Sequence, residues 1–286
     1  MLKFFQWICK FNFGTFEKEE FKKFLRMGLI FALIIGVYWT LRPLKDAIFI
    51  QLVDRLHLPY AKTVSVIALL PLVMFYTKLI EKNSREKMLK ILPAFYGITI
   101  LIFSIVMYFA QAPQEVIDAR SSMSFLATRG LGYLWYLFVE SFGSLVVALF
   151  WAFSADTTEP ASAKRGFPLV VALGQIGGII FPFTVGGLPH RLGLTTDAIS
   201  IIILGLLTLS IILVVRYFLK ATPKHLLKSF EGKNEKKAEA EQEPGFLEGL
   251  KLMLKHKYLL GIFAANFIYE IIVTIFDFNF KISAGA

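Results

Sequence analysis

Residues 130–153 read GLGYLWYLFVESFGSLVVALFWAF, a run of 24 residues with Glu140 as its only charged side chain. As an α-helix this run would be about 36 Å long, enough to cross the ~30 Å hydrocarbon core of a bilayer. Six more apolar runs lie outward from it: one begins at Met27, and the others are residues 63–80, 91–110, 167–188, 198–219 and 258–276. A soluble core does not need seven such runs, so the sequence predicts an all-α, polytopic membrane bundle of about seven transmembrane helices.

The overall composition excludes other classes of protein. Of the 286 residues, 56% are hydrophobic and only 18% are charged, which excludes an intrinsically disordered chain. The single cysteine, Cys9, excludes a secreted scaffold stapled by disulfides.

The positive charges predict a topology. Lys and Arg exceed Asp and Glu by ten, an excess that could indicate a nucleic-acid partner. However, 23 of the 31 basic residues fall in segments that alternating spans would put on one side, at residues 1–26, 78–90, 164–165 and 216–257, and five fall on the other side. The positive-inside rule then predicts a multi-pass protein of the cell (inner) membrane with a cytoplasmic N-terminus and no nucleic-acid partner.

The spans and charged segments divide the chain into four parts. We expect a basic amphipathic lead-in at residues 1–26, a six-helix transmembrane bundle at 27–219, a charged cytoplasmic linker at 220–257 and a seventh transmembrane helix at 258–286. Six helices, a charged loop and a further helix are typical of transporters built from two six-helix halves. A missing C-terminal half, or a homodimer, would then complete the bundle.

The first span has an unusual end. Residues 27–41 are apolar but would form only about 22 Å of helix, too short to cross the bilayer. The helix must therefore continue through the charged residues 42–46, where Pro43 predicts a kink or a break.

Arg42 and Lys45 are three residues apart and would share a helical face. Charges within a membrane cost about 2.5–3.5 kcal/mol each and usually face a cavity, so two cations at this depth would suit an anionic ligand. The alternative is a helix that starts near Phe21, with this cluster at its hydrated outer end and paired internally through Asp46.

Glu140 lies near the middle of its run. It could balance Lys45 or Arg42, take up a proton, or contact substrate hydroxyls, and a purely structural ion pair is equally compatible with the sequence. The nearby Tyr136 is interpreted as part of an aromatic belt or of the packing. Four further polar residues of the seventh span share one face and could line a path: Asn266, Glu270, Asp277 and Lys281.

Motifs for catalysis or metal binding are not evident in the sequence. No Gly-Lys-Ser/Thr follows a glycine-rich turn, and the four histidines are scattered without metal-ligand spacing. Gly174 and Gly178 form a small-xxx-small pair that favours close helix packing. We therefore expect no catalytic residue, metal or cofactor.

Several patches carry a family resemblance: TLRPLKD at residues 40–46, SREK at 84–87, ESFGSLVVALFWAFSA at 140–155 with AKR at 163–165 and PL at 168–169, and KYL at 257–259. Together they resemble the Tlc-type nucleotide transporters, the non-mitochondrial ATP:ADP antiporters of intracellular bacteria and plastids. The corresponding motifs of that family are Leu-Arg-x-x-Lys-Asp in the first helix and Glu-x-x-Gly-Ser in the fourth. The resemblance extends over nearly the whole chain from about Phe21.

The resemblance implies an MFS-like bundle of twelve helices, of which this chain would hold the N-terminal six and the first of a second half. It implies strict exchange of ATP inward against ADP and phosphate outward. Lys45 would be the family's essential first-helix lysine and Glu140 its fourth-helix glutamate. Asp277-Phe278-Asn279-Phe280-Lys281 stands where the family has Glu-Val-Thr-Trp-Lys, so Asp277 would be its acidic residue and Glu270 an additional charge.

Our leading hypothesis is an ATP:ADP exchanger that works by alternating access and is not an enzyme. Arg42 and Lys45 would bind the nucleotide phosphates, and Glu140 and Asp277 would form ion pairs when the cavity is empty. One alternative is a transporter of the same fold for another nucleotide or phosphorylated anion, in which Glu270 carries a proton. A second alternative, from another class, is a membrane scaffold that transports nothing.

Overall fold

The computed structural model describes residues 16–110, 122–193, 198–227 and 246–283. The chain divides into two compact units, Met1–Glu239 and Ala240–Ala286. Within the described residues, seven helices are long and apolar enough to cross a membrane. The prediction of an all-α, polytopic membrane protein with about seven transmembrane helices is therefore confirmed.

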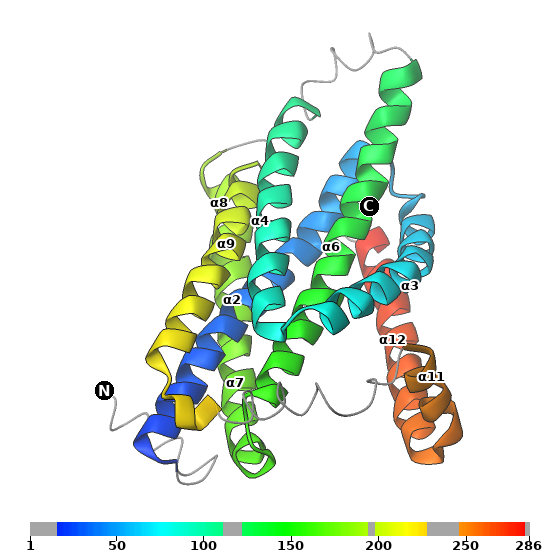
Figure 1. Cartoon of the computed structure of the whole chain (residues 1–286). Helices are drawn as coiled ribbons and strands as arrows, with labels where there is room; N and C mark the ends of the chain where they lie inside the picture. The colour runs from blue at the N-terminus through cyan, green and yellow to red at the C-terminus, as the bar shows by residue number, and fades with distance from the viewer. Residues whose placement is uncertain (1–15, 111–121, 194–197, 228–245, 284–286) are drawn as a thin grey trace. The chain divides into compact units, whose positions relative to one another are not determined.

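The first unit holds six of these seven helices (Figure 1). They are α2 (Lys18–Leu52), α3 (Leu58–Lys82), α4 (Arg85–Ala110), α6 (Ser122–Asp156), α7 (Pro160–Phe181) and α9 (Ala198–Ala221). Three short elements also belong to it: the π-helical turn η1 (Pro182–Gly186), α8 (Leu188–Arg191) and the 3-10 turn η2 (Lys224–Leu227).

Helix α2 is longer than the sequence pattern suggests. It begins at Lys18 rather than at Met27, so its first residues overlap the lead-in that we predicted for residues 1–26. It also continues through Pro43 to Leu52, so the possible break at Pro43 does not occur. A proline inside a helix removes one backbone hydrogen bond, and here α2 continues past it while packing against α6 and α7.

α2 is the central helix of the first unit. It packs most extensively against α7 and also contacts α6 and α9, while α4 packs against α9 and α6, and α3 lies mainly against α6. The contact with α7 requires glycine, because a Cβ atom at Gly177 would lie only 2.2 Å from the carbonyl oxygen of Ala32. Gly174 and Gly178 also face α2, as expected of a pair that permits close helix packing.

The second unit contains α11 (Phe246–Lys255) and α12 (Lys257–Ser283), which pack against each other. Within α12 the rings of Phe263 and Phe267 stack, with centroids 5.9 Å apart. The boundary between the two units falls inside the predicted linker, of which residues 228–245 lie outside the described residues.

Candidate functional site

A partly buried ion pair joins α2 to α6. The ammonium of Lys45 contacts the carboxylate of Glu140 and lies 3.8 Å from Oδ1 of Asp46. The same Nζ lies 4.0 Å from the centroid of the Tyr136 ring. Tyr136 and Glu140 are four residues apart and share one face of α6, so a single turn of that helix provides both a carboxylate and an aromatic ring to the cation.

The two partners differ in burial. The side chain of Lys45 is 6% exposed, whereas that of Glu140 is 38% exposed. Desolvating a cation costs several kcal/mol, and the carboxylates beside Lys45 offset that cost. Glu140 is therefore the more exposed partner of the pair, and Lys45 is the more buried one.

The depth of the pair follows from the length of α6. Sixteen residues separate Glu140 from Asp156 near the end of this helix, which corresponds to about 24 Å. Next to Glu140 on α6, Ser144 is exposed, whereas Ser141 is buried and lies 2.7 Å from the hydroxyl of Tyr96 on α4. The exposed Ser144 therefore lies one turn from Glu140 on α6, while Ser141 contacts α4.

Arg42 contacts a different group from Lys45. Its Cζ lies 5.5 Å from the centroid of the Trp39 ring, in a cation–π arrangement within α2. The sequence left open which cation Glu140 balances, and the structure pairs it with Lys45. The sequence pattern did not single out Trp39, and Tyr136 was assigned to an aromatic belt or to packing. Both rings could have been noticed from their spacing, because Trp39 lies one helical turn before Arg42 and Tyr136 lies one turn before Glu140.

The polar residues predicted on the seventh span lie on α12. Asn266 and Glu270 are exposed, and the amide of Asn266 donates to the carbonyl oxygen of Ile262 at 2.8 Å. The side chains of Asp277 and Lys281 lie outside the described residues. The polar path along this helix stays a prediction.

A second group of charged residues lies at the end of the first unit where α2 begins, and its hydrogen bonds join α2 to neighbouring segments. Glu20 accepts hydrogen bonds from Ser162 and, at 3.1 Å, from Arg165, both on α7. Lys23 donates to the carbonyl oxygens of Thr157 and, at 3.0 Å, of Leu226. We call this set the end clamp: Glu20, Lys23, Thr157, Ser162, Arg165 and Leu226.

Two further contacts extend the same end of the unit. Arg26 donates to the carbonyl oxygen of Ala221 at 2.7 Å, and Arg85 forms an ion pair with Asp156 at 2.6 Å. The start of α2, the α3–α4 connection, the α6–α7 connection and the end of α9 therefore meet at one end. These are segments that the charge pattern assigned to a single side of the membrane.

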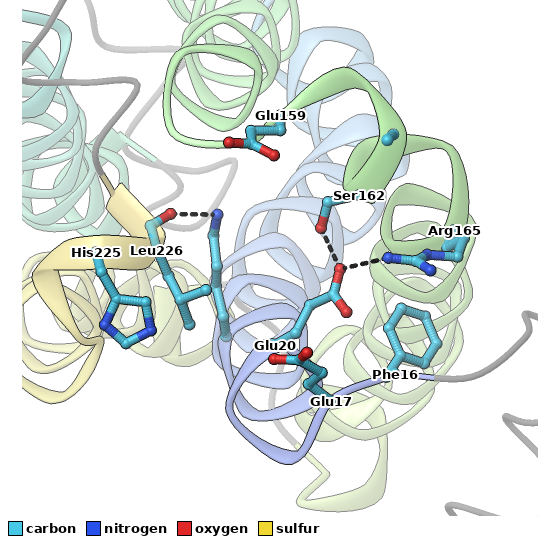
Figure 2. A pocket seen from close by; sticks show the side chains of 10 residues that line it. Phe16, Glu17, Glu20, Glu159, Ser162, Arg165, His225 and Leu226 are labelled. Atoms are coloured by element: carbon cyan, nitrogen blue, oxygen red, sulfur yellow. Dashed lines mark hydrogen bonds and ion pairs between the residues drawn. The ribbon is translucent and has the colours of Figure 1, made fainter.

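The end clamp borders a pocket of about 520 Å³ (Figure 2). Glu20 accepts a hydrogen bond from Arg165, and Lys23 donates one to the carbonyl oxygen of Leu226. His225 Nε2 lies 3.4 Å from a carboxylate oxygen of Glu19. Lys23 and Lys45 are 22 residues apart on α2, which corresponds to about 33 Å of helix. The pocket is thus distant from the Lys45–Glu140 pair, and its contacts hold helix ends together.

Comparison with known proteins points to one family. The family model described as "TLC ATP/ADP transporter" matches residues 3–284. "ADP,ATP carrier protein 1" of Paranosema grylli is 23% identical over 90% of this chain and 52% of its own length. "ADP,ATP carrier protein 3" of Rickettsia bellii (strain RML369-C) is 23% identical over 93% of this chain and 59% of its own length.

A third relative, "ADP,ATP carrier protein 1" of Rickettsia prowazekii (strain Madrid E), is 22% identical over 85% of this chain. The chain spans about half of the length of these relatives, from 52% to 59%. No solved structure is significantly similar to the chain.

Proposed function

The chain belongs to the TLC ATP/ADP transporter family, and we propose that it takes part in the exchange of ATP for ADP across a membrane by alternating access. On this proposal the nucleotides are transported substrates, and the protein catalyses no chemical reaction. The names of the relatives, which are ADP,ATP carrier proteins, support this choice of substrate.

The observation that carries the proposal is the unequal burial of the Lys45–Glu140 pair. In the empty state Glu140 neutralises the lysine. A nucleotide that enters from the exposed side displaces the carboxylate and places a phosphate beside Lys45, while Arg42 attracts another part of the polyphosphate. The cation is compensated both with and without ligand, and the exchange of partners couples binding to the change between the two access states.

We further propose that the N-terminus is cytoplasmic and that the protein lies in the cell (inner) membrane. The end of the bundle where α2 begins carries the segments richest in Lys and Arg, which agrees with the positive-inside rule. A second six-helix half, from further sequence or from a second copy, completes the transport path. Asn266, Glu270, Asp277 and Lys281 would line that path from α12.

The test is nucleotide exchange in proteoliposomes that contain the protein expressed from its complete gene. We expect uptake of labelled ATP to require internal ADP, to be lost in Lys45→Ala and to persist in Lys78→Ala, which changes an exposed lysine of α3. Uptake that ignores internal ADP, or that Lys45→Ala leaves unchanged, would contradict the proposal. Uptake that follows an imposed pH gradient without internal nucleotide would indicate proton coupling instead.

Loss of activity in Lys45→Ala needs a folding control. Lys45→Arg keeps a cation next to Glu140, so it does not leave this carboxylate without a positive charge. The double variant Lys45→Met/Glu140→Gln removes both charges of the pair, so neither Lys45 nor Glu140 is left as a charge without the other, while Asp46 is unchanged. If the double variant is folded and still exchanges nucleotide, the pair is structural and the proposed mechanism is wrong.

A further inference from the structure

Trp39 is a large aromatic side chain that is exposed well inside a transmembrane helix. It is 41% exposed and lies on α2 six residues before Lys45, about 9 Å along the helix axis. Its ring is in edge-to-face contact with that of Tyr38, with centroids 5.9 Å apart. Sixteen residues, or about 24 Å of helix, separate it from Lys23 of the end clamp, so it does not lie in an interfacial aromatic belt.

The indole is supported by α7. A Cβ atom at Gly178 would lie 3.1 Å from Cδ1 of Trp39 and 3.2 Å from a side-chain carbon of Ile35. The absence of a side chain at Gly178 therefore lets the edge of the ring rest against α7. Gln175, one turn earlier on α7, is exposed and presents an amide that can both donate and accept hydrogen bonds.

The position of Arg42 indicates that this face of α2 lies against protein or water and not against lipid. Its guanidinium lies 5.5 Å from the centroid of the indole. An arginine at this depth rarely faces lipid and usually faces a bundle interior or a water-filled cavity. Trp39, Arg42 and Lys45 succeed one another at intervals of three residues, so they form one ridge that leads from the indole to the Lys45–Glu140 pair.

From this arrangement we infer that Trp39 is the stacking platform for the base of the transported nucleotide. The inference rests on the proposed function and adds the position of the base to it. With the terminal phosphates at Lys45, the ridge places the base of an extended nucleoside diphosphate at the level of Trp39. Arg42 then lies between them, where it contacts the phosphate nearest the ribose, and Gln175 can bond to the edge of the base.

A stacking platform should change the affinity for nucleotides but not for polyphosphates without a base, which distinguishes it from a site that binds only phosphate. Stacking of a base on an aromatic side chain contributes to affinity by an amount that corresponds to about 5- to 150-fold. It acts on ligands that have a base and leaves base-free polyphosphates unaffected. Trp39 is thus a specificity-determining residue, whereas Lys45 acts on both classes of ligand.

The experiment measures binding to the protein from its complete gene in lipid nanodiscs, with ADP and tripolyphosphate as competing ligands. Trp39→Leu should weaken ADP about 5- to 150-fold and change tripolyphosphate less than twofold. Trp39→Phe, which keeps an aromatic face, should recover most of the affinity for ADP. The matched control is Phe183→Leu on η1, which also removes an exposed ring next to an arginine, since Cζ of Arg191 lies 4.7 Å from the Phe183 ring.

The outcomes distinguish a failure of the stacking platform alone from a failure of the proposed nucleotide exchange. If Trp39→Leu leaves ADP unchanged, or weakens ADP and tripolyphosphate equally, Trp39 is not a platform, although nucleotide exchange through Lys45 would stand. If the wild-type protein binds neither ligand, the proposed function fails and the platform fails with it.

Discussion

Lys45 and Glu140 form an ion pair across two helices in which the cation is almost fully buried and the carboxylate is partly exposed. An ion pair in which both partners are equally buried would be expected to serve only to hold the two helices together. Here the carboxylate is the more exposed partner, and the lysine is a buried cation that needs a compensating charge. This asymmetry is the reason to expect exchange of one anion for another at Lys45.

The first prediction concerns the energetics of this pair. Glu140→Ala leaves Lys45 with Asp46 at 3.8 Å as its nearest carboxylate. We expect the protein to lose about 1–3 kcal/mol of stability, less than for a fully buried pair because Glu140 is partly exposed. Thermal unfolding of the detergent-solubilised protein measures the loss.

A double-mutant cycle provides the control for that loss. The double variant Lys45→Met/Glu140→Gln should be destabilised by less than the sum of Lys45→Met and Glu140→Gln measured singly, because it leaves neither member of the pair as a charge without the other. Strictly additive effects would show that the two side chains do not interact.

The second prediction concerns Gly143, which lies on α6 beside the aromatic pair of α2. A Cβ atom at Gly143 would lie 2.2 Å from Cε2 of Tyr38, so Gly143→Ala must displace that ring. We expect a loss of about 1–3 kcal/mol from overpacking and weaker nucleotide binding. Gly130→Ala is the matched control in the same helix, since no atom beyond its chain neighbours and the local helix backbone lies within 4 Å of its Cβ position. Equal effects of the two substitutions would refute the steric explanation.

The third prediction concerns the end clamp. Lys23→Met removes the donor to the carbonyl oxygens of Thr157 and Leu226 and leaves both without that partner. Loss of the buried bond to Thr157 costs about 1–3 kcal/mol and loss of the part-buried bond to Leu226 costs less, so we expect a fall in the unfolding temperature. Hydrogen exchange should also become faster around η2. The neighbouring exposed lysine supplies the control, and Lys22→Met should change neither quantity.

The fourth prediction tests the orientation of the protein. In a Cys9→Ser background, Leu56→Cys would report on the α2–α3 connection, where Leu56 is 78% exposed, and Lys87→Cys on the start of α4. A membrane-impermeant maleimide added to intact cells should label the first variant and reach the second only after permeabilisation. The reverse pattern would place the N-terminus outside.

The number and class of the helices could be predicted from the sequence because each span is a local property. A run such as residues 130–153 crosses a bilayer whatever its neighbours are, since apolar length alone decides it. The first and last residues of each helix could not be predicted as well. Charged residues 18–26 do not resemble a span, yet α2 begins at Lys18 because Glu20 and Lys23 are satisfied by contacts with α7, Thr157 and Leu226.

By itself, then, the sequence determined that this stretch of chain forms about seven transmembrane helices, with charges at Arg42, Lys45 and Glu140 that need compensation. Only the tertiary structure decided that Glu140 pairs with Lys45 and that Arg42 lies against Trp39. The physical reason is that transmembrane helices are apolar on nearly every side, so their periodicity does not reveal which face meets which neighbour. Rotation and crossing follow from close contacts such as Gly177 with Ala32, which form only when the helices pack.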